Sequence, residues 1–152
     1  MVLLLRHASA GERLASPAED RLRALDSAGR AEVRQLRYLL GRFAIDRIVT
    51  SPYVRCVETV GPIARAWRLE IEACAELEPD APLADILALL AELPDATLVC
   101  THREVVERLF GGEVSCEKAG CLQLERRRGS WAPVDYMPPP PSLRQRTKAA
   151  LV

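Results

Sequence analysis

Both histidines of this sequence lie near arginines, an arrangement suited to the chemistry of phosphate groups. His7 follows Arg6 directly, and His102 follows a second apolar run much later in the chain. Arg55 lies in the first turns of a predicted helix. Two arginines can clamp a phosphoryl group through paired, charge-assisted hydrogen bonds. A neutral imidazole can attack phosphorus and form a covalent phosphohistidine. We therefore predict a phosphate site in which His7 is the nucleophile.

The other candidate residues would hold the phosphoryl oxygens. Arg6 and Arg55 would form the clamp, and His102 would act with the amide groups at the start of a helix. A lone histidine after an apolar run is more often structural, and Arg55 could equally pair with a glutamate on its own helix. Because both histidines lie beside arginines, we favour a functional role for these residues over a structural one. Because these arginines and the helix disfavour the imidazolium, we expect both histidines to be neutral in the empty site.

The elements that position these residues are typical of an α/β sheet. Short apolar runs predict buried parallel strands, and amphipathic or capped stretches between them predict helices. The expected strands are 2–5, 47–50 and 97–100, with a possible strand at 69–71, and the expected helices are 29–40, 52–67, 83–93 and 102–110. Such sheets bind ligands beyond the carboxyl ends of their strands. His7, Arg55 and His102 should meet there.

Several local signals refine this interpretation. Ser51-Pro52 should cap the second helix, and Thr101 with Glu104 fits a capping box. The polar stretch 8–25 should be a loop with at most one helical turn, bordering the site. Alternating residues on both sides of Arg128-Gly129 predict an antiparallel hairpin at the sheet edge.

The composition fits one ordinary globular domain. The 152 residues are 49% hydrophobic and 28% charged, so we expect one core, over residues 1–137, and a Pro-rich, basic tail over 138–152 that is extended or disordered. Three of the 21 basic residues lie in the tail, which leaves 18 basic against 21 acidic groups in residues 1–137. Without a broad basic face or many aromatic residues, nucleic acid is a poor candidate partner.

The cysteines and the N-terminal residues indicate a reducing compartment. The five cysteines are widely spaced and never form C-x-x-C, so we expect free, mostly buried thiols, and no metal or cofactor site. The apolar run 2–5 is too short for a signal peptide or a membrane span. We therefore expect a cytoplasmic protein without a membrane partner.

Four motifs together resemble the histidine phosphatase superfamily, the phosphoglycerate mutase-like fold. They are Leu5-Arg6-His7-Ala8, Arg23-Ala-Leu25 with Gly29 behind it, Ser51-Pro-Tyr-Val-Arg55-Cys-Val-Glu-Thr59, and the late strand before His102. The small bacterial phosphohistidine phosphatases are the most similar branch. The resemblance covers residues 1 to about 137 and implies a three-layer α/β/α sandwich. Its sheet would be mostly parallel, with an antiparallel edge hairpin.

The resemblance also implies roles for individual residues. The residue matching His7 is the phosphorylated nucleophile of the family, and those matching Arg6, Arg55 and His102 complete the phosphate pocket. Glu76 best matches the family's proton donor, with Glu78 as the alternative, although either could be a solvated loop charge. The chain departs from the family at Arg103, where glycine is frequent; this third cation could select an anionic group or point to solvent.

The C-terminal part of the domain has a second resemblance. Gly120-Cys-Leu-Gln-Leu, Gly129-Ser-Trp and Asp135-Tyr136 are similar to the histidine phosphatase half of actinobacterial proteins that carry a Nudix hydrolase. This implies nucleotide substrates. Because the sequence holds no Nudix box, a separate Nudix-type partner is one expectation.

The most favoured function is therefore a metal-independent phosphatase. Its substrate would be a phosphohistidine protein, a nucleotide or another phosphorylated small molecule. Two alternatives remain open: a phosphate- or nucleotide-binding regulator that has lost turnover, and an isomerase of the phosphoglycerate mutase type. The isomerase would need a second loop to grip its substrate, for which the chain has little room.

Overall fold

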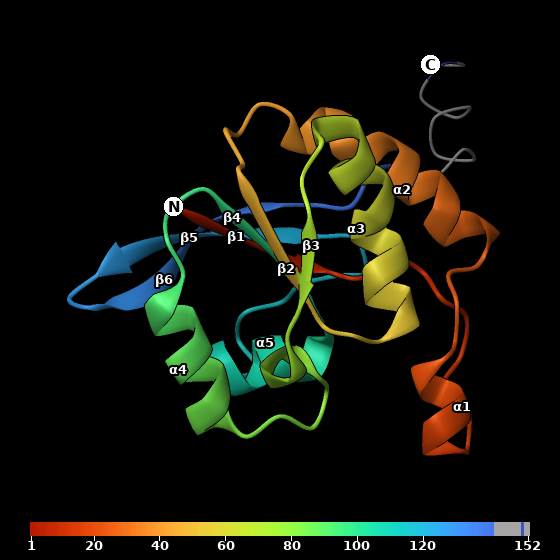
Figure 1. The fold of residues 1–152 in the computed structure, drawn as a ribbon, viewed down its shortest axis with the longest axis horizontal. Helices are drawn as coiled ribbons and strands as arrows, with labels where there is room; N and C mark the ends of the chain where they lie inside the picture. Colours follow the sequence, from red (N-terminus) through yellow and green to blue (C-terminus); the bar gives the residue numbers. More distant parts are fainter. Residues whose placement is uncertain (142–149, 151–152) are drawn as a thin grey trace.

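The computed structural model describes residues 1–141 and residue 150, and in this part the chain forms one sheet between helices (Figure 1). The strands are β1 (Val2–Arg6), β2 (Arg47–Thr50), β3 (Ile71–Ala73), β4 (Thr97–Thr101), β5 (Cys121–Arg127) and β6 (Ser130–Met137). The helices are α1 (Pro17–Arg21), α2 (Ser27–Leu40), α3 (Val54–Trp67), α4 (Leu83–Glu92) and α5 (Arg103–Phe110), with a short 3₁₀ helix, η1 (Ala75–Leu77). Most of the predicted tail lies outside the described residues.

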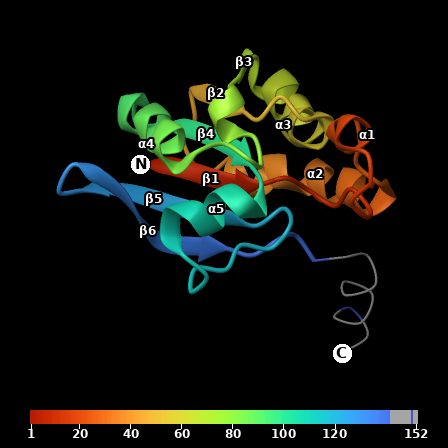
Figure 2. The same ribbon diagram turned by 90° about the horizontal axis from the view of Figure 1, so that it is seen from below.

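The sheet is parallel except at one edge. Its six strands follow the order β3-β2-β4-β1-β5-β6. β3, β2, β4 and β1 are parallel, whereas β5 pairs antiparallel with both β1 and β6. Figure 2 shows the β5–β6 hairpin at one side of the molecule and α1 at the other. This confirms the predicted α/β fold with an antiparallel edge hairpin.

The core lies on both faces of the sheet, which explains the continuous apolar run of β1. Leu3 and Leu5 pack with the apolar faces of α2 and α3, whereas Val2 and Leu4 pack with those of α4 and α5. All four side chains are buried. Alternate residues of a strand point to opposite faces, so a strand covered twice has no polar side. Figure 1 shows α2 with α3 on one side of the sheet and α4 with α5 on the other.

Two predicted helix caps are wrong, because the residues concerned have other partners. α3 begins at Val54 with Tyr53 as its N-cap, so the buried Ser51 hydroxyl accepts from the Tyr53 amide before the helix, at 3.3 Å, and lies beside His102. Thr101 pairs with Arg6 as the last residue of β4, and its hydroxyl donates to the Leu77 carbonyl at 2.8 Å. The expected capping box therefore does not form.

Other boundaries moved by a few residues. The third strand, expected at 69–71, is β3 at Ile71–Ala73, where it pairs with β2. The loop 8–25 contains one short helix, α1, whose five residues slightly exceed the single turn expected. No helix in the described part of the chain is both long and apolar enough to cross a membrane.

Candidate active site

The fold gathers the predicted residues at the carboxyl ends of neighbouring strands. β4 lies between β1 and β2, so the segments that follow these three strands are adjacent. The His7 amide donates to the Thr101 carbonyl at 3.0 Å. The rings of His7 and His102 are 5.3 Å apart. Tyr53 belongs to the segment that follows β2 and connects it to the other two. Its ring lies 4.9 Å from that of His102 and 4.9 Å from the guanidinium of Arg55.

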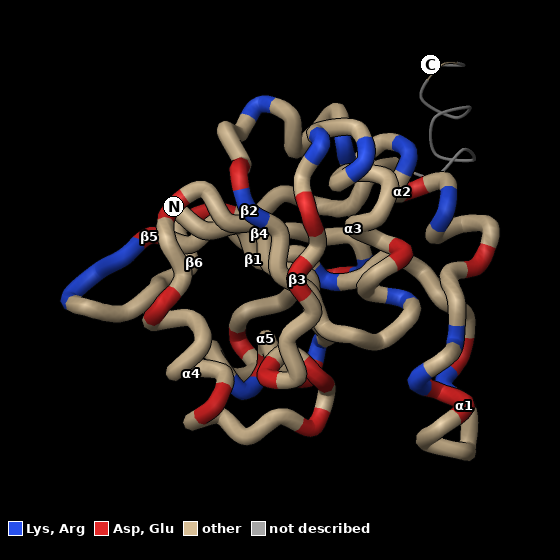
Figure 3. Tube along the Cα trace, viewed as in Figure 1, with Lys and Arg blue, Asp and Glu red and all other residues tan. Residues whose placement is uncertain are grey.

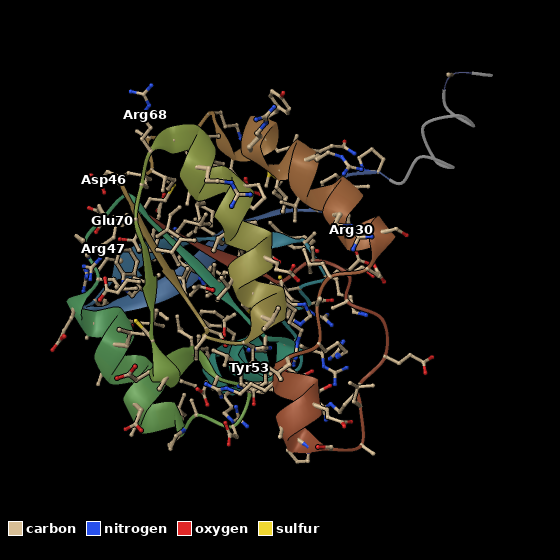
Figure 4. All side chains as sticks on the ribbon, turned by 45° about the vertical axis from the view of Figure 1, so that its right-hand side comes forward. Arg30, Asp46, Arg47, Tyr53, Arg68 and Glu70 are labelled. Carbon is tan, nitrogen blue, oxygen red and sulfur yellow. The ribbon has the colours of Figure 1, made fainter. Side chains whose placement is uncertain are left out.

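Figure 4 shows how far this end of the sheet lies from the other. Tyr53 lies at the beginning of α3, close to α1, whereas Asp46, Arg47, Arg68 and Glu70 lie at the opposite end of the neighbouring elements. The site thus occupies one end of the α/β sandwich.

The hydrogen bonds of His7 determine which of its nitrogens can react. The ring is 6% exposed, and Nδ1 lies 2.8 Å from the carbonyl oxygen of Ala8. A carbonyl only accepts, so Nδ1 must hold the proton of the neutral ring. Nε2 then carries the lone pair and is the nucleophilic atom.

His102 has the opposite arrangement. Its Nε2 lies 2.8 Å from the Ser51 hydroxyl and 3.5 Å from the Cys56 thiol, both of which can donate a proton to it. We assign the Ser51 hydroxyl as the donor, because its oxygen already accepts from the Tyr53 amide at 3.3 Å; with this assignment the proton of the neutral ring is on Nδ1, which is buried and has no protein partner. His102 therefore offers one free hydrogen-bond donor.

Both arginines are held at their Nη atoms and unpaired at Nε. Arg6 Nη1 donates to the carbonyl of Cys116 at 2.9 Å, and Arg55 Nη1 donates to that of Asp20 at 2.8 Å. The Nε atom of each is buried without a hydrogen-bond partner. With His102 Nδ1, these are the three unpaired buried polar side-chain atoms within residues 1–141. Buried donors without acceptors are costly, and both arginines act electrostatically on His7 and His102, so these unpaired atoms favour an anionic ligand.

Burial and charge together keep the two histidines neutral. Burial is the largest cause that lowers the pKa of His7, to about 3, followed by the charges of Arg55, Arg6 and Arg23, while the Ala8 carbonyl opposes the shift. Burial also leads for His102, with a pKa of about 2, and His7 and the same arginines add to it. The direction agrees with the expectation from the sequence, but burial outweighs the arginines.

The two candidate proton donors differ in their surroundings. Glu76 lies on η1, is exposed, and makes no hydrogen bond or ion pair within the described residues. Glu78 is half-buried and pairs with Arg21 at 2.9 Å. Arg21 in turn lies over the ring of Tyr53, 4.9 Å from its centre. Glu78 is thus connected to the edge of the site, and the identity of the donor stays a prediction.

The remaining basic residues lie at the edge of the site or far from it. Arg103 is exposed and lies 3.5 Å from Glu107, one turn further along α5. Its charge contributes to the lowered pKa of Arg6, after burial as the main cause. Arg126 to Arg128 are at the tip of the β5–β6 hairpin, on the side of the molecule away from α1 (Figure 3).

Two residues of the site escaped the sequence analysis as functional candidates. Asp20 is buried beside Arg55, and Arg23 pairs with Asp20 at 2.9 Å. Their spacing of three residues, in a polar loop, was the available signal, because a carboxylate and an arginine at this spacing can pair on a helical turn. Surface pairs of this kind are common, so the spacing alone does not indicate burial.

Beside Arg55 the site opens into a cavity of about 390 Å³. It is lined by the segment around Arg13 and α1, by Tyr53, by Pro79 and Asp80, and by Glu104 and Arg108 of α5. The cavity carries charges of both signs and offers room for the part of a substrate beyond its phosphoryl group. Within residues 1–141 there is no group of three or more His, Cys, Asp and Glu side chains that could hold a metal ion.

Comparisons with known proteins agree with this geometry. The sequence model of the histidine phosphatase superfamily (branch 1) matches residues 2–79. The chain is 32% identical over 124 residues to an 8-oxo-(d)GTP phosphatase of Mycolicibacterium smegmatis; the match covers 78% of this chain and 38% of that protein. The chain therefore spans well under half the length of this relative.

Solved structures show the same architecture. A putative phosphohistidine phosphatase SixA from Agrobacterium tumefaciens has a TM-score of 0.72 and 27% identity, covering 91% of this chain and 97% of that one. A protein histidine phosphatase SixA complexed with tungstate has a TM-score of 0.71 and 24% identity, covering 90% and 96%. The second likeness is one of fold.

Proposed function

This chain belongs to the histidine phosphatase superfamily (branch 1), and we propose from that premise that it hydrolyses phosphorylated substrates through a phosphohistidine on His7. The family, the fold and the phosphatase class predicted from the motifs are confirmed by the family match and the similar proteins. The observation that carries the proposed mechanism is that Arg6, Arg55 and His102 each keep one buried nitrogen without a hydrogen-bond partner.

A bound phosphoryl group would satisfy all three nitrogens. Its oxygens are strong acceptors, and the Nε atoms of Arg6 and Arg55 and the Nδ1 atom of His102 are donors. Donors fixed in advance, in a site with little water, stabilise the charge that develops on these oxygens in the transition state. The arginines and His102 would therefore hold the group while His7 attacks it.

The proposed reaction has two steps. First, the lone pair on His7 Nε2 forms a bond to phosphorus while the bond from phosphorus to the leaving oxygen or nitrogen breaks. The leaving group keeps the bonding electrons and takes a proton. Second, a water oxygen attacks phosphorus and gives a proton back to the group that donated one in the first step; the N–P bond breaks, Nε2 regains its lone pair, and inorganic phosphate leaves. These residues perform both steps without a metal ion.

Glu76 remains the proposed donor of the first proton, and Glu78, which its ion pair with Arg21 places at the edge of the site, is the alternative. A general acid matters most for poor leaving groups, such as alkoxides, and least for phosphoramidates. Glu76→Gln and Glu78→Gln should be compared on an alkyl phosphate and on phosphoramidate. The true donor is the residue whose substitution slows the alkyl phosphate far more, and equal losses on both substrates would argue against either glutamate.

Three substrate classes fit the proposal: phosphohistidine proteins, nucleotides and other phosphorylated small molecules. The similar proteins named above include a phosphohistidine phosphatase and an 8-oxo-(d)GTP phosphatase. The cavity beside Arg55 has a volume in the range of small-molecule sites, which supports the second and third classes. Action together with a separate Nudix-type protein stays a prediction.

The test is a substrate panel combined with trapping of the phosphoenzyme. Phosphorus-32-labelled members of each class are mixed with the protein and quenched in alkali, where phosphohistidine survives. We expect label on the wild-type protein that disappears as phosphate is released, and no label on His7→Ala. Label that persists without release would support the regulator, and transfer within a sugar acid would support the isomerase. Unchanged hydrolysis by His7→Ala would overturn the proposal.

A further inference from the structure

Asp20 and Arg23, which the proposed mechanism does not use, form a buried ion pair beside the phosphate site. Arg23 Nε lies 2.9 Å from Asp20 Oδ1, and the two side chains are 13% and 11% exposed. Asp20 also contacts Arg55 twice. Its carbonyl accepts from Arg55 Nη1 at 2.8 Å, and its Oδ2 lies 3.4 Å from Arg55 Nη2.

The same pair fixes the segment that follows the nucleophile. Arg23 Nη1 donates to the carbonyl oxygens of Ala10 at 2.8 Å and Gly11 at 3.2 Å. The amide of Leu14 donates to Asp20 Oδ1 at 2.9 Å. The loop after His7 is thus tied to this pair of side chains, and the guanidinium of Arg55 is held by the Asp20 carboxylate and by the main-chain carbonyl of the same residue.

These contacts restrain Arg55 at both Nη atoms and leave its buried Nε free. A free arginine side chain has rotamer entropy that a ligand must otherwise overcome when it orders the group. An arginine that is already ordered binds the phosphoryl group without that loss. We propose that the Asp20–Arg23 pair is a positioning device that directs Arg55 Nε toward the phosphoryl group; this inference rests on the proposed function.

The charges of the site are consistent with this role. Burial opposes ionisation of Asp20, but the Leu14 amide, Arg23 and Arg55 together lower the pKa of its carboxyl, so it stays a carboxylate. The three guanidiniums of Arg6, Arg23 and Arg55 with this one carboxylate leave an excess of two positive charges. This excess matches a phosphoryl dianion, and loss of Asp20 would leave three cations close together.

The experiment is a double-mutant cycle. Asp20→Asn and Arg23→Ala are each made in the wild-type protein and in Arg55→Ala. The dissociation constant of inorganic phosphate is measured by calorimetry, and kcat and KM are measured on the best panel substrate. In the wild-type background we expect each substitution to weaken phosphate binding and lower kcat by about tenfold. In the Arg55→Ala background we expect each substitution to change phosphate affinity and kcat by less than about threefold, because the pair would then have no Arg55 side chain to position.

The controls separate positioning from folding. Glu19→Gln makes the same chemical change as Asp20→Asn at the neighbouring, exposed position of α1, and should leave binding and kcat unchanged. Arg23→Lys retains a cation for Asp20 but cannot hold both Asp20 and the loop carbonyls as a guanidinium does, so it should recover part of the loss. It also serves as the test variant if Asp20→Asn lowers the melting temperature strongly.

The outcomes are distinguishable from those of the proposed function. If Asp20→Asn and Arg23→Ala lower phosphate affinity and kcat by the same factor with and without Arg55, while the unmodified protein binds phosphate, the positioning role alone is overturned. Phosphate binding that is insensitive to Arg55→Ala would instead remove Arg55 from the site and with it the proposed function. A smaller loss in the Arg55→Ala background, with partial recovery in Arg23→Lys, would support the pair as a positioning device.

Discussion

At the scale of single residues, two neighbouring histidines obtain different chemistry from their hydrogen bonds. The Ala8 carbonyl occupies Nδ1 of His7 and leaves a lone pair on Nε2. With the Ser51 hydroxyl assigned as the donor to Nε2 of His102, the proton of this ring is on Nδ1. One imidazole can therefore attack phosphorus while the other donates to its oxygens, although the rings are 5.3 Å apart.

The role of His7 predicts the effect of removing it. His7→Ala should lower kcat by at least about 10³-fold, because no other group supplies the nucleophile. The melting temperature should change little, since the residue lies at a strand end rather than in the apolar core. Steady-state kinetics and circular dichroism check the two expectations; kcat within tenfold of wild type would contradict the assignment.

The low pKa values of the histidines predict how pH affects phosphate binding. A dianion beside His7 and His102 supplies the opposite charge that the empty site lacks, so it should raise both pKa values from about 3 and about 2. Phosphate should therefore bind with proton uptake, and its affinity should fall as pH rises through the histidine titration of the complex. Imidazole NMR with and without phosphate measures this directly, and titrations that phosphate leaves unchanged would place both rings outside the site.

At the scale of elements, the start of α2 lies against the backbone that follows the nucleophile. A Cβ atom at Gly29 would lie 2.0 Å from the carbonyl oxygen of Ser9, so only glycine permits this approach. Asp26 caps the same helix by accepting from the Gly29 amide at 2.8 Å, and its carboxylate also accepts from Ser9 Oγ. The helix and the loop thus form one unit.

Gly29→Ala should therefore destabilise the fold and the site together. We expect a loss of about 1–3 kcal/mol in the free energy of unfolding, because the contact is with backbone that cannot move aside cheaply. Catalysis should fall as well, since the loop after His7 must shift. Gly61→Ala is the matched control: its Cβ would meet only the flexible Arg65 side chain at 3.4 Å, so urea unfolding should show no comparable loss.

At the scale of the whole molecule, the burial of two neutral histidines links stability to pH. Both pKa values lie below the usual 6.5, so the unfolded chain binds more protons than the folded one between about pH 6.5 and 3. The contribution of the two neutral histidines to the free energy of unfolding is therefore complete above pH 6.5 and is lost as the pH falls from about 6.5 to 3. The melting temperature should drop from pH 7 to pH 5 more steeply in the wild type than in His102→Gln. Parallel slopes would show that His102 does not titrate in this way.

The proposed reaction also predicts indifference to chelators. The histidines and arginines supply nucleophile and charge themselves, so activity should survive excess EDTA. Hydrolysis of the best panel substrate after dialysis against EDTA tests this. Complete loss, restored by Zn²⁺ or Mg²⁺, would require a different mechanism.

The sequence by itself determined the fold class, and it predicted the residues of the proposed phosphate pocket that the fold brings together. Arg6, His7 and His102 follow buried apolar strands directly, and neighbouring parallel strands end at one edge of the sheet, so adjacency along the chain becomes adjacency in space. Arg55 was reached in the same way through the helix after β2. To place these four residues together, the prediction needed only short-range sequence patterns and the rule that neighbouring parallel strands end at one edge of a sheet.

The tertiary structure decided what depends on contacts between distant segments. It directs the Ser51 hydroxyl to His102, orders Arg55 through Asp20, and connects Glu78 rather than Glu76 to the edge of the site. A polar side chain in a loop or at a helix cap has several possible hydrogen-bond partners of similar strength, and the sequence alone does not distinguish them. Which partner they bind is fixed only when the strands align, because burial then makes each unpaired polar group costly.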